Sequence, residues 1–146
     1  MIALDTNVIV RVITRDDPTQ ARRAAELMRK NSLRLSKTVL LETEWVLRFS
    51  YEYDAPSINR ALATLVGLEN LTVEDATAVD LAISWHAKGM DFADALHLAS
   101  ATPATRFATF DQRLAKAAAG LGASTKVELL GKPHGKPSAR PRVPVR

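Results

Sequence analysis

The chain has 146 residues, 47% of them hydrophobic and 25% charged, which is the composition of a globular domain long enough to bury a core. It has no cysteine, which excludes disulfides, thiol catalysis and cysteine-ligated zinc and fits a cytoplasmic protein. No apolar stretch approaches the roughly 20 residues of a membrane span, and Asp5 interrupts the N-terminal apolar segment too early for a signal peptide.

The net charge of +4 comes from one end of the chain. Residues 131–146 hold five of the 20 lysines and arginines and no acid, so the preceding residues carry 15 basic and 16 acidic side chains. Four prolines in the same segment exclude a helix or a central strand there. We therefore expect a folded domain over 1–130 and a disordered basic tail over 131–146, which is either a solvated end or a weak electrostatic arm for nucleic acid.

Short apolar strands alternate with helices along residues 1–130. Asp17-Pro18 places an N-cap before a proline at the first helical position, and Asp54-Ala55-Pro56-Ser57 starts another helix in a similar way. Strands are expected at about 2–4, 32–36, 71–73, 106–109 and 125–129, and helices at about 7–14, 18–30, 38–51, 55–68, 79–89, 93–101 and 111–120.

This alternation predicts an α/β fold with a central, mainly parallel sheet and helices on both faces, a three-layer α/β/α sandwich. Ligand sites in such sheets lie beyond the carboxyl ends of the strands. Asp5 and Asp111 both follow predicted strands and are therefore expected at that edge.

Four acids stand in apolar surroundings in the sequence: Asp5, Glu42, Asp94 and Asp111. A carboxylate in such a setting is costly to keep ionised unless a positive group meets it. Carboxylates together predict a Mg²⁺ or Mn²⁺ site, with one metal ion or with two that clamp a phosphoryl displacement. Such a site cuts phosphodiesters without histidine or cysteine.

Each acid also has a purely structural interpretation. Asp5 and Asp111 precede helices and serve equally as N-caps, and Asp94 complements a helix dipole from the first turn. Glu42 lies within an apolar helical run and is expected to be buried, whereas Glu44 is expected on a solvated helix face. Spacing alone therefore leaves the function open.

The sequence motifs around the four acids narrow the choice of function. Asp5-Thr6-Asn7-Val8-Ile9, Leu41-Glu42-Thr43-Glu44-Trp45-Val46-Leu47, Asp91-Phe92-Ala93-Asp94-Ala95-Leu96 and Thr109-Phe110-Asp111-Gln112-Arg113-Leu114 together resemble PIN-domain ribonucleases. More narrowly, they look like the VapC toxins of bacterial type II toxin–antitoxin pairs. The resemblance covers roughly residues 1–130 in the family's order, with no departure at the four acids.

The resemblance implies a PIN-like fold and a Mg²⁺- or Mn²⁺-dependent endoribonuclease that acts as a toxin. Asp5 and Asp94 would be direct metal ligands, and Glu42 and Asp111 would complete the catalytic acids. Thr6 and Asn7 would orient Asp5, and Thr109 would do so beside Asp111. The implied partners are an RNA substrate, a cognate antitoxin that covers the active-site groove and a second copy of the chain in a homodimer, with no membrane.

Two rival functions stay open. An acid after the first strand also suits aspartyl-phosphate chemistry, as in receiver domains and phosphatases, although Asn7 stands where the phosphatase pattern has a second aspartate. The other rival is a catalytically idle PIN-fold binding module.

Other residue types give no competing site. The histidines lack metal-ligand spacing, and no phosphate-binding glycine motif supports a nucleotide cofactor. Trp45 and Trp85 are expected in the core or in a subunit contact.

Overall fold

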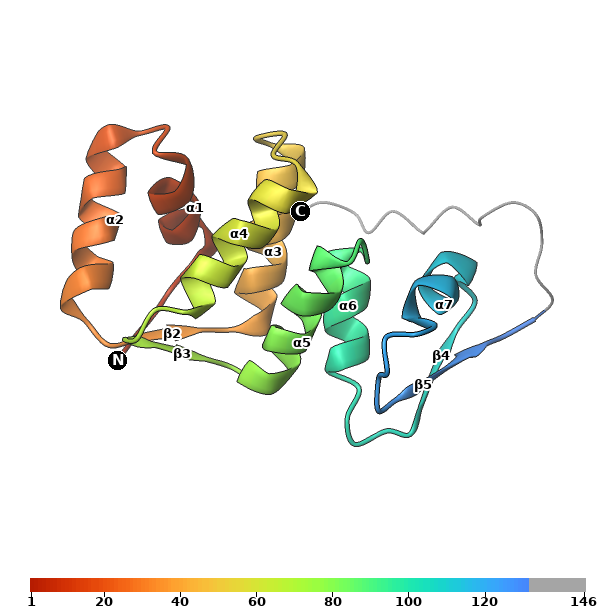
Figure 1. The fold of residues 1–146 in the computed structure, drawn as a ribbon. Helices are drawn as coiled ribbons and strands as arrows, with labels where there is room; N and C mark the ends of the chain where they lie inside the picture. Colours follow the sequence, from red (N-terminus) through yellow and green to blue (C-terminus); the bar gives the residue numbers. More distant parts are fainter. Residues whose placement is uncertain (132–146) are drawn as a thin grey trace. The chain divides into compact units, whose positions relative to one another are not determined.

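The structure, a computed structural model, describes residues 1–131 (Figure 1). The disordered tail predicted for 131–146 therefore lies outside the described residues, apart from Gly131. The chain divides into two compact units, the first formed by residues 1–100 and the second beginning at Ala101.

The first unit contains a three-stranded parallel sheet. Its strands are β1 (Ile2–Ala3), β2 (Leu33–Leu35) and β3 (Leu71–Val73), in the order β1-β2-β3. Leu33 and Leu35 are fully buried, while Arg34 between them is exposed. This alternation is the period of two that gives a strand one buried face and one solvent face.

Six helices complete the first unit. Two of them start with a Pro in the first turn and an aspartate N-cap, as the sequence predicts: Asp17 Oδ1 accepts a hydrogen bond from the Gln20 N–H at 3.0 Å, and Asp54 Oδ1 accepts one from the Ser57 N–H at 2.8 Å. The helices are α1 (Thr6–Thr14), α2 (Pro18–Lys30), α3 (Lys37–Phe49), α4 (Ala55–Val66), α5 (Ala76–Ala87) and α6 (Phe92–Ala99).

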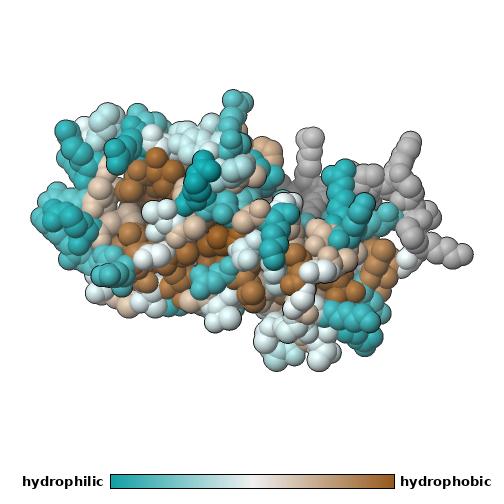
Figure 2. Space-filling model, viewed as in Figure 1, coloured by the Kyte–Doolittle hydropathy of each residue, from teal (hydrophilic) through white to brown (hydrophobic). Residues whose placement is uncertain are grey.

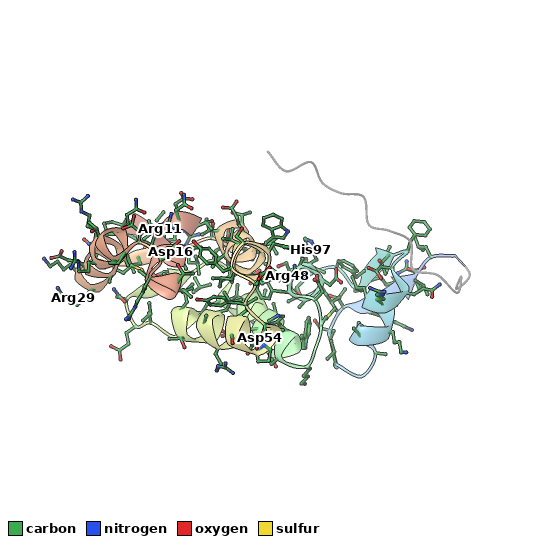
Figure 3. The ribbon with its side chains drawn as sticks, turned by 90° about the horizontal axis from the view of Figure 1, so that it is seen from above. Arg11, Asp16, Arg29, Arg48, Asp54 and His97 are labelled. Carbon is green, nitrogen blue, oxygen red and sulfur yellow. The ribbon has the colours of Figure 1, made fainter. Side chains whose placement is uncertain are left out.

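Helix α3 is the structural centre of this unit. It packs against α1, α4 and α6, and α5 in turn packs against α4 and α6. Figure 3 shows α1, α2 and α3 along one side of the unit and α4 and α5 along the other. The largest fully buried side chains come from these helices and from β2, among them Phe92, Leu40, Leu47, Ile58 and Leu62.

The second unit is a β–α–β arrangement. Strands β4 (Arg106–Thr109) and β5 (Lys126–Leu129) pair in parallel, and α7 (Gln112–Ala118) connects them. Leu114 of α7 is buried, and the Thr125 hydroxyl donates a hydrogen bond to the Ala104 carbonyl at 3.0 Å. These contacts join α7 and the start of β5 to the rest of the unit.

The predicted fold class is confirmed: strands alternate with helices, and every strand pair is parallel. One detail differs from the expected central sheet. Within residues 1–131 the five strands are divided between a three-stranded and a two-stranded sheet. No helix among these residues is long and apolar enough to cross a membrane.

Candidate active site

Asp5 lies at the carboxyl end of the sheet, two residues after β1 and directly before α1. It occupies the N-cap position of α1 with extended backbone, yet its side chain accepts no capping hydrogen bond. The side chain is exposed, while the following residue, Thr6, is 3% exposed. The capping interpretation of Asp5 is therefore not supported, and its carboxylate is directed to solvent at the edge where α/β folds bind ligands.

Asp94 lies in the first turn of α6 and is 7% exposed. The residue before this helix, Asp91, caps it: Asp91 Oδ2 accepts a hydrogen bond from the Asp94 N–H at 3.1 Å. A buried carboxylate is costly unless hydrogen bonds or positive charge compensate it. Of the four acids, Asp94 alone is buried.

Glu42 lies on α3, and its predicted burial is wrong. Its side chain is exposed, and Glu44, predicted on a solvated face, is 3% exposed. Residues two apart on a helix point in nearly opposite directions, so when one of this pair is buried the other faces solvent. Because it is exposed, the Glu42 carboxylate can reach a ligand. The cost of burying a charge, however, is no longer an argument that Glu42 binds a metal ion.

Asp111 belongs to the second unit and acts there as the N-cap of α7. Its Oδ1 accepts hydrogen bonds from the N–H groups of Arg113 at 2.9 Å and Leu114 at 3.2 Å. Thr109 Oγ1 accepts a hydrogen bond from the Asp111 N–H at 3.0 Å, which places Thr109 beside this acid. The structural interpretation of Asp111 is thus observed, and a catalytic role would be additional.

Helix packing brings together the elements that carry the three acids of the first unit. Asp5 begins α1, Glu42 lies on α3 and Asp94 begins α6, and α3 contacts both of the other helices. A single helix therefore links all three. Since Asp111 is described with the second unit, its place relative to these three remains a prediction from the sequence.

The donor set has the chemistry that Mg²⁺ and Mn²⁺ prefer, because all candidate ligands are carboxylates. Nowhere in residues 1–131, however, are three or more His, Cys, Asp or Glu side chains grouped so that they could hold a metal ion. Mg²⁺ takes one or two protein carboxylates and completes its shell with water and substrate phosphate. Asp5 and Asp94 satisfy that requirement by ligand type and number.

A pocket of about 650 Å³ lies elsewhere in the first unit. Residues at the end of α2, such as Met28 and Arg29, line it together with Ser32 before β2 and Asn70 before β3. It therefore opens at the amino ends of these strands, and none of the four acids lines it. It is not the candidate active site.

Sequence reasoning missed a charged cluster beside Asp94. Arg48 on α3 contacts both the buried Glu44 and Asp91, the capping residue of α6. The available signal was the spacing of Glu44 and Arg48, since residues four apart on a helix are neighbours.

Of the histidines, His86 is buried, His97 is exposed on α6, and His134 lies outside the described residues.

The fold defines an α/β domain with parallel strands, a class whose ligands bind beyond the carboxyl ends of the strands, where the exposed Asp5 lies. The sequence profile of the PIN domain matches residues 2–120, which is most of the chain. The protein therefore belongs to the PIN domain family, a nuclease-type fold whose members generally use divalent metal ions. Neither a curated protein nor a solved structure gives a match to the chain.

Proposed function

We propose that this protein is a metal-dependent endoribonuclease that hydrolyses RNA phosphodiester bonds. The observation that carries the proposal is the arrangement of three acids on helices that meet at α3, within a PIN domain: Asp5 exposed at the end of β1, Glu42 exposed on α3, and Asp94 buried at the start of α6.

The four acids are proposed to have different roles, according to their surroundings. Asp5 and Asp94 would hold Mg²⁺ or Mn²⁺, which supplies an activated water and neutralises charge on the phosphate when it is bound. Asp94, fixed by the capped first turn of α6, presents a preorganised ligand, while the exposed Asp5 and Glu42 can adjust to the substrate. Asp111 is proposed as the fourth acid, in addition to its capping role.

The decisive experiment measures cleavage of a single-stranded RNA by the purified protein with Mg²⁺ or Mn²⁺, and with chelator. We expect cleavage only with metal, and expect Asp5→Asn and Asp94→Asn to reduce the rate by more than about 100-fold, because each removes a ligand charge. Asp80→Asn, at an exposed position of α5, is the matched control and should cleave normally.

Asp111→Asn separates the two roles of that residue. Asparagine is as good an N-cap as aspartate, so the variant keeps the start of α7 and loses only the charge. A loss of cleavage without a loss of stability would assign the charge to catalysis. Full cleavage by Asp111→Asn would leave this acid with its capping role alone.

The rival functions give different results in the same protein. An aspartyl-phosphate domain would take up phosphate from acetyl phosphate at Asp5, which a nuclease should not do. An idle binding module would leave RNA intact with every metal, and Asp94→Asn would then change nothing.

The toxin role rests on the resemblance to VapC proteins and is part of the same proposal. Induced expression in bacteria should arrest growth, and Asp94→Asn should relieve the arrest. An antitoxin would be the protein whose co-expression restores growth with the active enzyme.

A homodimer is also proposed. Trp45 and Phe49 on α3 are 42% and 57% exposed and are available for such a contact. Figure 2 shows hydrophobic side chains reaching the surface among hydrophilic ones.

A further inference from the structure

Glu44 is a buried carboxylate on the helix that also carries Glu42. It is 3% exposed, and burial raises the pKa of its carboxyl group, an effect that Arg48 opposes. Arg48 lies one helical turn further on, with its Nε 3.1 Å from Glu44 Oε1 and 3.3 Å from Oε2. Both carboxylate oxygens thus lie close to one guanidinium N–H, which fixes the direction of the Arg48 side chain.

The other end of Arg48 faces the start of α6. Its terminal Nη2 lies 3.9 Å from Asp91 Oδ1, and the guanidinium lies 4.6 Å from the centre of the Phe49 ring. The second oxygen of Asp91 accepts the hydrogen bond from the Asp94 N–H. The charges therefore run in a chain from α3 to the backbone of Asp94: Glu44, Arg48, Asp91. Figure 3 shows Arg48 and His97, a residue of α6, on the same part of the first unit.

The pair joins the buried Glu44 carboxylate to an Arg48 side chain that is 41% exposed, and an ion pair of this kind is a poor source of stability, because apolar residues of similar size often serve as well or better. The contacts of this pair bear instead on orientation. Arg48 is held by Glu44 and in turn opposes the charge of Asp91, whose carboxylate sets the first turn of α6.

We propose that Glu44, Arg48 and Asp91 are positioning residues that hold Asp94 in a fixed orientation relative to α3 and its Glu42. None of the three needs to touch the metal or the RNA. The inference rests on the proposed function in giving Asp94 the role of a metal ligand, and it adds the residues that keep this ligand in place.

The first experiment uses calorimetry to measure the affinity of the full chain for Mn²⁺. The test variant is Arg48→Met. We expect the dissociation constant to rise roughly 10-fold, the usual size of effect when a group that orients a ligand is removed. The matched control is Lys30→Met. It also breaks a Glu–Lys/Arg pair four residues apart on a helix, Glu26–Lys30 at 2.6 Å on α2, and should leave Mn²⁺ affinity unchanged.

A second variant separates positioning from stability, because Arg48→Met alone leaves the buried Glu44 without its cation. In the double variant Glu44→Met/Arg48→Met two apolar side chains replace the pair, and the stability to urea should recover. The Arg48 charge is still missing beside Asp91, so Mn²⁺ affinity should stay about 10-fold weaker. Recovery of both stability and affinity in the double variant would show that the pair is only structural and would overturn the proposal.

Amide hydrogen exchange gives a readout that does not depend on metal. The Asp94 N–H, bonded to Asp91, should exchange roughly 10-fold faster in the double variant, whereas the Ser57 N–H, capped by Asp54 on α4, should be unchanged. Faster exchange at Asp94 in a protein that binds no Mn²⁺ would support the positioning chain and refute the nuclease proposal. Unchanged exchange at Asp94 would refute the positioning chain, whatever the protein does to RNA.

Discussion

At the scale of the single residue, His86 shows how burial fixes a protonation state. The side chain is 8% exposed on α5 and lies edge-on to the Phe92 ring, with centroids 5.6 Å apart. Asn59 Nδ2 lies 3.0 Å from His86 Nδ1. Since an amide nitrogen only donates, Nδ1 must accept, which requires the neutral ring. Burial lowers the pKa of His86; Arg48 acts in the same direction, and Asp91 acts in the opposite one.

This arrangement predicts acid sensitivity. Because the pKa is lower in the folded protein, the unfolded chain binds the extra proton first as pH falls. The contribution of His86 to stability is complete above about pH 6.5, the ordinary histidine value, and is lost progressively below it. Urea unfolding between pH 7.5 and 5 should therefore show a decrease in stability that is smaller in His86→Gln. The exposed His97→Gln is the control, and an equal decrease in all three proteins would refute the assignment.

The contrast between Glu42 and Glu44 marks the limit of sequence reasoning at this scale. Apolar residues occur on both sides of α3, including Leu40 and Leu47 in the core and the exposed Trp45 and Phe49. With no clear polar face, periodicity cannot tell which of two acids two residues apart points inward. Asp94 is easier to place from the sequence, because it lies in the first turn of α6, a helix that Asp91 caps.

At the scale of the element, the helix starts were the most predictable feature. Asp17 and Pro18 begin α2, and Asp54 and Pro56 begin α4, at the positions that the sequence indicates. These signals are local: a side-chain oxygen satisfies an N–H of the first turn, and proline has no N–H to leave unpaired. Such pairs act over four residues, so no knowledge of the tertiary structure is needed to predict them.

The N-cap of α2 gives a stability prediction. Asp17→Ala removes the acceptor of the Gln20 N–H and should lower the free energy of unfolding by about 1 kcal/mol. Asp80→Ala, at an exposed position of α5, should change it by less than about 0.5 kcal/mol. Urea unfolding followed by circular dichroism measures both. If Asp80→Ala lowers the free energy of unfolding as much as Asp17→Ala does, the cause is the removal of a negative charge and not the loss of the N-cap.

At the scale of the whole molecule, the pairing of strands could not be predicted in full. That all pairs are parallel follows from helices lying between successive strands. Which strand edges pair depends on contacts between distant residues, and β1 and β4 carry no local signal for their neighbours. The sequence therefore predicts the class of fold, and the division of the five strands of residues 1–131 into sheets of three and two is seen only in the structure.

Charge is also a property of the whole chain, and its distribution gives a test of RNA binding. Residues 132–146 carry five basic residues and no acid, while the preceding residues are nearly neutral. If this segment contacts RNA, its charges displace counterions and make binding depend on salt. A chain ending at Gly131 keeps every described strand and helix and loses all five of these charges.

For single-stranded RNA the slope of log affinity against log salt is about 0.7 per neutralised phosphate, so removal of five contacts would lower it by up to about 3.5. We expect the shortened chain to bind an RNA oligonucleotide more weakly at low salt and with a flatter salt dependence. At saturating RNA its rate of cleavage should be unchanged, because none of the four acids has been removed. An identical salt slope for the full and the shortened chain would mean that the basic segment makes no contact with RNA.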